Sequence, residues 1–219
     1  MKAFKKILFT WMFFTGTFIW AQPFISTQSH EGAVTSIFSF DSKASSDGSF
    51  YSAGKDGFII KWDAVDGIGE QYQITDLQIQ IIVRNPVTSD IAVYETDGIS
   101  TFRISVLDSK SFSRRYTKRY SSAVSMLSFS EGGTYLFVGT TSVNGMYILD
   151  AKTGVTKKQP SDISGIITFV KSGPSEKTAL FYSTSGYLYY YDLENMGVFK
   201  KFSVDFLVVL ELLKLILGD

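Results

Sequence analysis

Short apolar runs recur along this chain, and turn residues separate them. The first run, at residues 34–40, alternates apolar and polar side chains with the period of a half-buried strand. The Asp56-Gly57 pair further on is a hairpin signal, because two-residue hairpin turns need positive φ values. The first unit therefore predicts one four-stranded antiparallel sheet, with strands at residues 34–40, 50–53, 58–62 and 71–74.

The same order of strands and turns recurs three more times. Each third strand ends in an apolar or aromatic residue followed by aspartate, at Trp62-Asp63, Leu107-Asp108, Leu149-Asp150 and Tyr191-Asp192. These aspartates are 45, 42 and 42 residues apart. Hairpin pairs recur with them, at Asp56-Gly57, Asp97-Gly98, Asn144-Gly145 and Ser185-Gly186. Such a period is typical of a repeat architecture, in which each small sheet buries its faces against its neighbours.

The first unit resembles a blade of the WD-repeat β-propeller family. His30 precedes the first strand, Ser52 lies in the second, Asp56 lies in the hairpin, and Trp62-Asp63 closes the third. Ser29 stands where the family has glycine. The resemblance implies that His30, Ser52, Asp56 and Trp62 form a structural hydrogen-bond network, in which each buried polar group satisfies another.

The resemblance implies an all-β fold of propeller blades, each a four-stranded antiparallel sheet. Within residues 22–203, the units lie at about 30–74, 75–119, 120–160 and 161–203. The later units have no histidine and carry Leu107, Leu149 and Tyr191 in place of Trp62, so we expect them to rely on packing alone. WD-repeat propellers usually close with about seven or eight blades. Four blades therefore predict an incomplete or open propeller.

The two ends of the chain differ in character from the repeats. Lys2, Lys5 and Lys6 precede an uncharged run at residues 7–20, which predicts a signal helix and a signal peptide at residues 1–21 with cleavage after Ala21. The alternative is an uncleaved membrane anchor, although a span needs about 20 apolar residues. We therefore expect a secreted or periplasmic protein with no stable membrane insertion after cleavage.

The last segment, residues 204–219, is apolar and rich in helix formers. Only Glu211 and Lys214 interrupt the apolar residues from 206 to 217, and no hairpin signal occurs there. One interpretation is a non-native tail from a truncated or frame-shifted reading frame. The other is a short C-terminal apolar helix that caps the open arc.

Composition narrows the partners and the chemistry. The 219 residues include 21 basic and 21 acidic side chains, and the net charge of zero disfavours nucleic acid or an anionic membrane as partner. The absence of cysteine excludes disulfides and thiolate chemistry. His30 is the only histidine, so it lacks partners for a metal site. We expect no cofactor, because the glycine-containing turns feed strands rather than the helix N-termini that cradle phosphates.

Three candidate sites carry alternative interpretations. His30, Ser52 and Asp56 imitate a nucleophile–base–orienter set, but the structural network explains them better. The basic residues Arg114, Arg115, Lys118 and Arg119 form either a partner-binding patch or a charged edge strand that resists pairing. The tyrosine cluster at residues 187–191 either binds a sugar or peptide, or packs between blades.

These observations favour a non-enzymatic scaffold that mediates protein–protein interaction, because loops on a rigid propeller often carry binding sites. The expected partner is a protein, and a homo-oligomer that completes the propeller is one form of that partner. An alternative is an extracytoplasmic propeller that binds a small molecule, a quinone cofactor or a glycan. A third interpretation is a truncated fragment without function.

Overall fold

The structure, a computed structural model, describes residues 29–39, 50–63, 66–88 and 90–204. In these residues the regular structure consists of β-strands, which form four antiparallel sheets of four strands. In each sheet the strands follow one another in sequence order, so each sheet is a meander and is called a blade below. None of the described ranges contains a helix long and apolar enough to cross a membrane.

The sixteen strands divide evenly among the blades. Blade 1 contains β1 (Val34–Phe38), β2 (Phe50–Gly54), β3 (Phe58–Trp62) and β4 (Gly69–Gln73). Blade 2 contains β5 (Gln78–Arg84), β6 (Ile91–Thr96), β7 (Phe102–Leu107) and β8 (Arg114–Tyr120). Blade 3 contains β9 (Val124–Phe129), β10 (Tyr135–Thr140), β11 (Met146–Asp150) and β12 (Thr156–Lys158). Blade 4 contains β13 (Ile167–Ser172), β14 (Thr178–Ser183), β15 (Tyr187–Asp192) and β16 (Gly197–Ser203).

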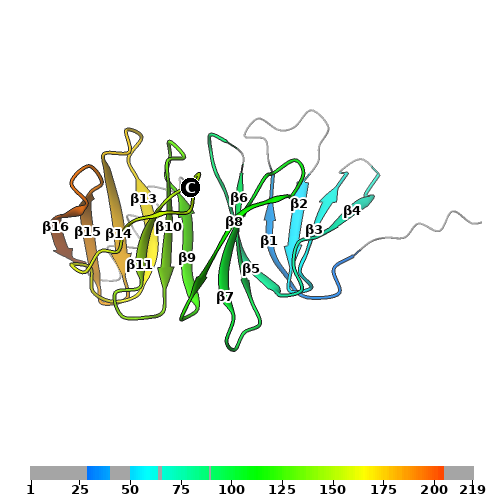
Figure 1. Cartoon of the computed structure of the whole chain (residues 1–219), viewed down its shortest axis with the longest axis horizontal. Coiled ribbons are helices and arrows are strands. Elements are labelled where there is room, and N and C mark those ends of the chain that lie inside the picture. The colour runs from blue at the N-terminus through cyan, green and yellow to red at the C-terminus, as the bar shows by residue number, and fades with distance from the viewer. Residues whose placement is uncertain (1–28, 40–49, 64–65, 89, 205–219) are drawn as a thin grey trace, which may run out of the picture.

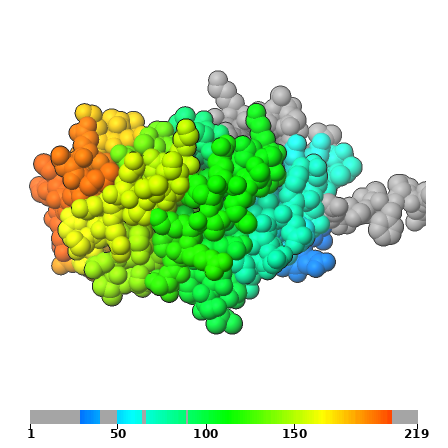
Figure 2. All heavy atoms as spheres, in the orientation of Figure 1, coloured from blue at the N-terminus to red at the C-terminus, as the bar shows by residue number. Residues whose placement is uncertain are grey.

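The blades stand side by side in sequence order, with blade 1 at one end of the row and blade 4 at the other (Figure 1). The first strands of successive blades are in contact, β1 with β5, β5 with β9 and β9 with β13. The space-filling view shows neighbouring blades packed closely along the row (Figure 2). The prediction of an all-β fold built from four-stranded antiparallel blades is confirmed. The expected signal helix and C-terminal helix lie outside the described residues.

The recurrent aspartates close the third strand of each blade through a local turn. Oδ1 of Asp108, Asp150 and Asp192 accepts hydrogen bonds from the backbone amides two and three residues later, at 2.8–3.2 Å. The fifth residue of every turn has a positive φ, at Gly67, Phe112, Gly154 and Met196. These aspartates are therefore turn residues, as their period predicts.

Each blade has two faces, and alternate residues of its strands point to one or the other. We call the face toward the preceding blade the rear face and the face toward the following blade the front face. In blade 2, Ile79 and Ile91 on the rear face join the core shared with blade 1, and Ile104 on the front face joins the core shared with blade 3. All three side chains are fully buried. The interior is thus a series of apolar layers between neighbouring sheets.

Candidate functional site

Four polar side chains of blade 1 meet at the end of β2. His30 Nδ1 lies 2.9–3.0 Å from the two carboxylate oxygens of Asp56, and His30 Nε2 lies 2.8 Å from Ser52 Oγ. The indole Nε1 of Trp62 donates to the same Ser52 hydroxyl at 2.7 Å. We call these four residues the blade 1 network. The structure brings together the complete set of residues that the WD-repeat resemblance implies.

Backbone groups hold the Asp56 carboxylate in place. The amides of Glu31 and Phe58 donate to its two oxygens at 2.9 and 3.2 Å. Burial raises the pKa of the Asp56 carboxyl, but the hydrogen bonds from His30, Phe58 and Glu31 outweigh it and lower the pKa overall. Gly54 permits this approach, because a Cβ there would lie 2.6 Å from His30 Nδ1. The network is thus held by three segments of the chain.

The chemistry available to the blade 1 network is restricted by its own hydrogen bonds. Ser52 is 4% exposed, and its hydroxyl already accepts the Trp62 N–H while it bonds His30. A serine nucleophile needs an exposed hydroxyl and nearby donors for an oxyanion. Among the described residues, no group of three or more acidic or histidine side chains is arranged to hold a metal ion.

Blade 2 carries a different polar network at the corresponding place, which sequence reasoning missed. Glu95 pairs with Ile79 in the sheet, as Gly54 pairs with Val34 in blade 1. The guanidinium of Arg103 donates to Glu95 Oε2 through Nε at 2.9 Å and Nη2 at 2.5 Å, and Nη2 also reaches Thr75 Oγ1 at 2.9 Å. Glu95 is fully buried. We call Thr75, Glu95 and Arg103 the blade 2 network.

Blade 4 has a hydroxyl network in the same region. Ser183 Oγ lies 2.7 Å from Ser185 Oγ, and the Ser185 hydroxyl donates to the Ser164 carbonyl at 3.0 Å. The Tyr189 hydroxyl lies 2.8 Å from Ser164 Oγ. The expectation that the later blades rely on packing alone is therefore wrong for blades 2 and 4. The residue types differ from those of the WD-repeat pattern, so no motif revealed them.

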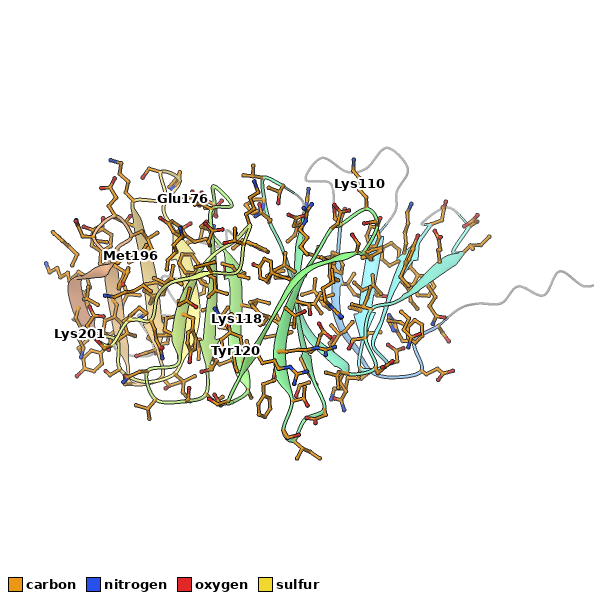
Figure 3. All side chains as sticks on the ribbon, viewed as in Figure 1. Lys110, Lys118, Tyr120, Glu176, Met196 and Lys201 are labelled. Atoms are coloured by element: carbon orange, nitrogen blue, oxygen red, sulfur yellow. The ribbon has the colours of Figure 1, made fainter. Side chains whose placement is uncertain are left out.

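The basic residues of β8 are largely engaged within the molecule. Arg114 Nη2 lies 3.5 Å from Glu95 Oε2, and Arg115 pairs with Asp90 at 3.0 Å and Asp108 at 2.9 Å. Lys118 Nζ bonds the Thr156 hydroxyl and the Gly154 carbonyl of blade 3, and it lies at the junction of blades 2 and 3 in Figure 3. Arg119 is exposed and makes no ion pair among the described residues. This geometry favours a stabilising outer strand over a free basic patch.

The tyrosine cluster of β15 is divided between the two faces of blade 4. Tyr189 and Tyr191 are fully buried in the core between blades 3 and 4. Tyr187 is half-buried beneath the Lys201 ammonium, which lies 3.5 Å from its ring centroid. Tyr190 is half-buried and contacts Phe199 edge-to-face at 5.7 Å. Packing therefore accounts for the buried members of the cluster.

The rear face of blade 1 exposes apolar side chains beside the blade 1 network. Val34 is 50% exposed, Ile37 69% and Phe50 37%. With Trp62, which stacks on Phe50 at 6.2 Å, they line an open groove of about 440 Å³. Singly exposed apolar residues are ordinary, but a contiguous group is typical of an interaction surface. The open propeller expected from the sequence leaves an end blade uncovered. The alternation of β1 did not identify these residues as exposed, because it is the same as that of a covered strand.

The chain matches the family described as TP_0598_N, N-terminal beta-propeller domain, over residues 23–214. It is also similar to a protein of Treponema pallidum (strain Nichols) whose description is "Uncharacterized protein". The two are 35% identical over 158 residues, which make up 72% of this chain and 26% of the relative. The chain thus spans about a quarter of the length of the relative that it matches.

Proposed function

The chain belongs to the TP_0598_N family of N-terminal β-propeller domains. We propose that it is a non-enzymatic, extracytoplasmic scaffold that binds another protein. The observation that carries the proposal is the apolar rear face of blade 1. Its side chains match the interior of a propeller in character, yet they are exposed. A protein surface is the partner that buries such a face most favourably.

The finer family assignment is part of the same proposal. The blade 1 network supports the interpretation of blade 1 as a WD-type repeat, because the four residues bond in the order that the resemblance implies. The other blades keep the turn aspartates but use other polar networks. Blade 1 therefore carries the WD character of the domain, and its neighbours diverge from it.

Photo-crosslinking from the rear face tests the binding function. Ile37 is replaced by a benzoylphenylalanine residue in the chain produced in its own cells, and Val143, 90% exposed at a hairpin of blade 3, is replaced in the control. We expect position 37 to form a discrete adduct with a protein, which mass spectrometry identifies. The same adduct should form again from the purified components. Equal labelling from both positions, or adducts at neither, contradicts the proposal.

The location and the absence of catalysis need separate measurements. Secretion with cleavage after Ala21 predicts a mature chain that begins at Gln22, which intact-mass analysis of the extracytoplasmic fraction measures directly. A mass that retains residues 1–21 contradicts the cleavage. For catalysis, a fluorophosphonate probe that attacks activated serines should leave Ser52 unlabelled. Stoichiometric labelling of Ser52 overturns the non-enzymatic assignment.

A small-molecule site is the second candidate, and one pocket supports it. A pocket of about 340 Å³ lies between blades 2 and 3 and is lined in part by Gln80, Tyr94, Thr96 and Phe102. This volume and the mixture of aromatic and polar groups suit a small ligand. Thermal melting of the chain in the presence of quinones or oligosaccharides measures whether these ligands bind. A saturable rise in Tm that Tyr94→Ala abolishes supports the second candidate, and no rise removes it.

A further inference from the structure

We propose that the rear face of blade 1 receives the front face of blade 4 from a second copy of this chain, so that two arcs close into one ring. This inference rests on the proposed function, because it names the partner of the same surface. Three independent features of the described residues carry it: the strand register of the rear face, the matching front face of blade 4, and an unused hydroxyl donor.

The strand register identifies the rear face of blade 1 as one half of an inter-blade interface. Ile37 pairs with Ser52 as Ile82 pairs with Val93, so Ile37 occupies in blade 1 the position of Ile82 in blade 2. By the same register, Val34 corresponds to Ile79 and Phe50 to Ile91. In blade 2 these three positions are 0–9% exposed beneath blade 1, but in blade 1 they are 37–69% exposed. The exposed face therefore has the pattern that another blade covers.

The front face of blade 4 has the complementary pattern. Phe181 in β14 aligns with Val93, so Leu180 and Tyr182 occupy the positions of Ala92 and Tyr94. Leu188, opposite Tyr182, likewise corresponds to Ile104. The blade 2 residues are 0–4% exposed in the core shared with blade 3, whereas Leu180, Tyr182 and Leu188 are half-buried. Blade 4 thus presents the face that packs against the rear of a following blade.

A repeated hydrogen bond gives the two faces polar complementarity. Each first strand has a bulge, and its extra residue is Thr35, Gln80, Ser125 or Thr168. Thr35 Oγ1 donates to the Ile79 carbonyl, and Ser125 Oγ donates to the Ile167 carbonyl, both at 2.9 Å in the next blade. Thr168 is exposed at the end of the row, and the equivalent carbonyl is that of Val34. Docking brings this donor and this acceptor together.

Geometry favours a closed pair over a single docking event. Blades 1 and 4 stand at opposite ends of the row, so one copy carries both halves of the interface (Figure 1). A two-fold axis relating two copies makes both contacts at once. The described blades of two copies number eight, which lies within the range of about 4–8 that propellers adopt. Because both interfaces form together, dissociation requires both to break.

Sedimentation of the purified chain with charged variants tests the pairing. We expect wild type to sediment as two copies, and both Ile37→Asp and Tyr182→Lys to lose that species, because each buries an unpaired charge. In the interface between blades 1 and 2, β5 contacts β1 and β2. By the same arrangement, β1 with Ile37 is expected to contact β13 and β14 of the second copy, and β14 carries Tyr182. An equimolar mixture of the two variants should recover a two-copy species, with one native interface and one that pairs the new charges.

The controls separate this inference from folding defects and from the proposed function. Val143→Asp, at an exposed hairpin, should leave the two-copy species unchanged. Leu188→Lys is the second front-face variant if Tyr182→Lys melts at a lower temperature than wild type. A wild-type monomer, growth beyond two copies, or variants that fail to complement overturn the closed pair. If the chain is a monomer but crosslinks from position 37 to a different protein, only this inference fails and the proposed function stands.

Discussion

Blades 1 and 2 share one backbone plan but differ in what holds the end of the second strand. In blade 1, neutral and charged groups from three segments meet at Ser52 and Asp56. In blade 2, a buried carboxylate at Glu95 is bonded by the guanidinium of Arg103. Both networks fasten the segment before the first strand, through His30 in one blade and Thr75 in the other.

This comparison teaches that the repeat conserves a place for polar bonding rather than one set of residues. The two blades also differ in packing, because the rear face of blade 2 is covered and that of blade 1 is exposed. Blade 1 therefore depends more on its polar network, whereas blade 2 combines an ionic network with two apolar cores. Variants in the two networks measure this difference directly.

The largest effect is expected from breaking the ionic network of blade 2. Among the described residues, Arg103→Ala leaves the fully buried Glu95 with Arg114, 3.5 Å away, as its one remaining charged partner. Removal of one partner from a buried ion pair typically costs about 3–5 kcal/mol, so we expect the free energy of unfolding to fall by about 3 kcal/mol in urea titrations. Arg119→Ala, at an exposed position of β8, should change it by less than about 0.5 kcal/mol. Equal effects of the two variants contradict the role of Arg103.

The hairpin glycines of blades 1 and 2 provide a matched pair with the next largest effect. Gly57 and Gly98 both have φ of 81°. A Cβ at Gly57 would lie 2.1 Å from the Thr75 carbonyl oxygen, while a Cβ at Gly98 would have no atom of the described residues within 4 Å. Gly98→Ala should therefore cost about 1 kcal/mol from the left-handed backbone alone, and Gly57→Ala about 2–4 kcal/mol.

Thermal and urea unfolding of these two variants measure the difference. A larger loss for Gly57→Ala means that the blade 1 hairpin is fixed by the connection to blade 2. The Gly57 carbonyl also accepts hydrogen bonds from the backbone amides of Ile74 and Thr75 in that connection, at 3.0 and 3.3 Å. Identical losses of unfolding free energy in the two variants would show that the blade 1 hairpin moves freely away from the Thr75 carbonyl. That result would contradict the view that this contact constrains the hairpin.

The third prediction concerns the blade 1 network. His30→Ala leaves the Asp56 carboxylate and the Ser52 hydroxyl without their shared partner, and the side chains of His30 and Asp56 are only 4% and 7% exposed. We expect a loss of about 2 kcal/mol in the free energy of unfolding. Thr75→Ala, at the corresponding place in blade 2, should cost about 1 kcal/mol because Arg103 keeps Glu95 as its partner. An unchanged unfolding midpoint for His30→Ala contradicts the structural role of the network.

The contrast between these networks also explains what the sequence could predict. The repeat, the strands and the turns follow from periodic apolar runs and Asp-Gly pairs, which act locally. The blade 1 residues could be grouped because they match a known pattern. Glu95 and Arg103 could not, since a carboxylate and a guanidinium eight residues apart in strands usually face solvent. Their burial depends on how blade 1 covers blade 2.

The exposure of Ile37 could not be predicted for the same reason, because it also depends on contacts between blades. Its alternation with polar residues is that of a strand with one covered face, and sequence alone does not say whether a neighbour covers it. The basic residues of β8 allowed two interpretations from sequence, a partner-binding patch or a charged edge strand. The structure pairs Arg115 with Asp90 and Asp108, and these contacts favour the edge strand. Periodicity thus reports local structure, and the contacts between blades decide which side chains remain available.

The smallest effect is expected from acid titration of the Asp56 carboxylate in the blade 1 network. Burial raises the pKa of Asp56, but the hydrogen bonds from His30, Phe58 and Glu31 lower it below the ordinary value of 3.8. A lowered folded-state pKa stabilises the protein above the unfolded-state value, and this contribution disappears as the pH falls through the folded-state value. The difference in unfolding free energy between wild type and Asp56→Asn should therefore narrow as the pH falls below about 3.8. Ser52→Ala is the matched control, because its lost hydroxyl does not titrate and its difference from wild type should stay constant in that range. If the Asp56→Asn difference also stays constant, the carboxylate is not stabilised by its partners in blade 1.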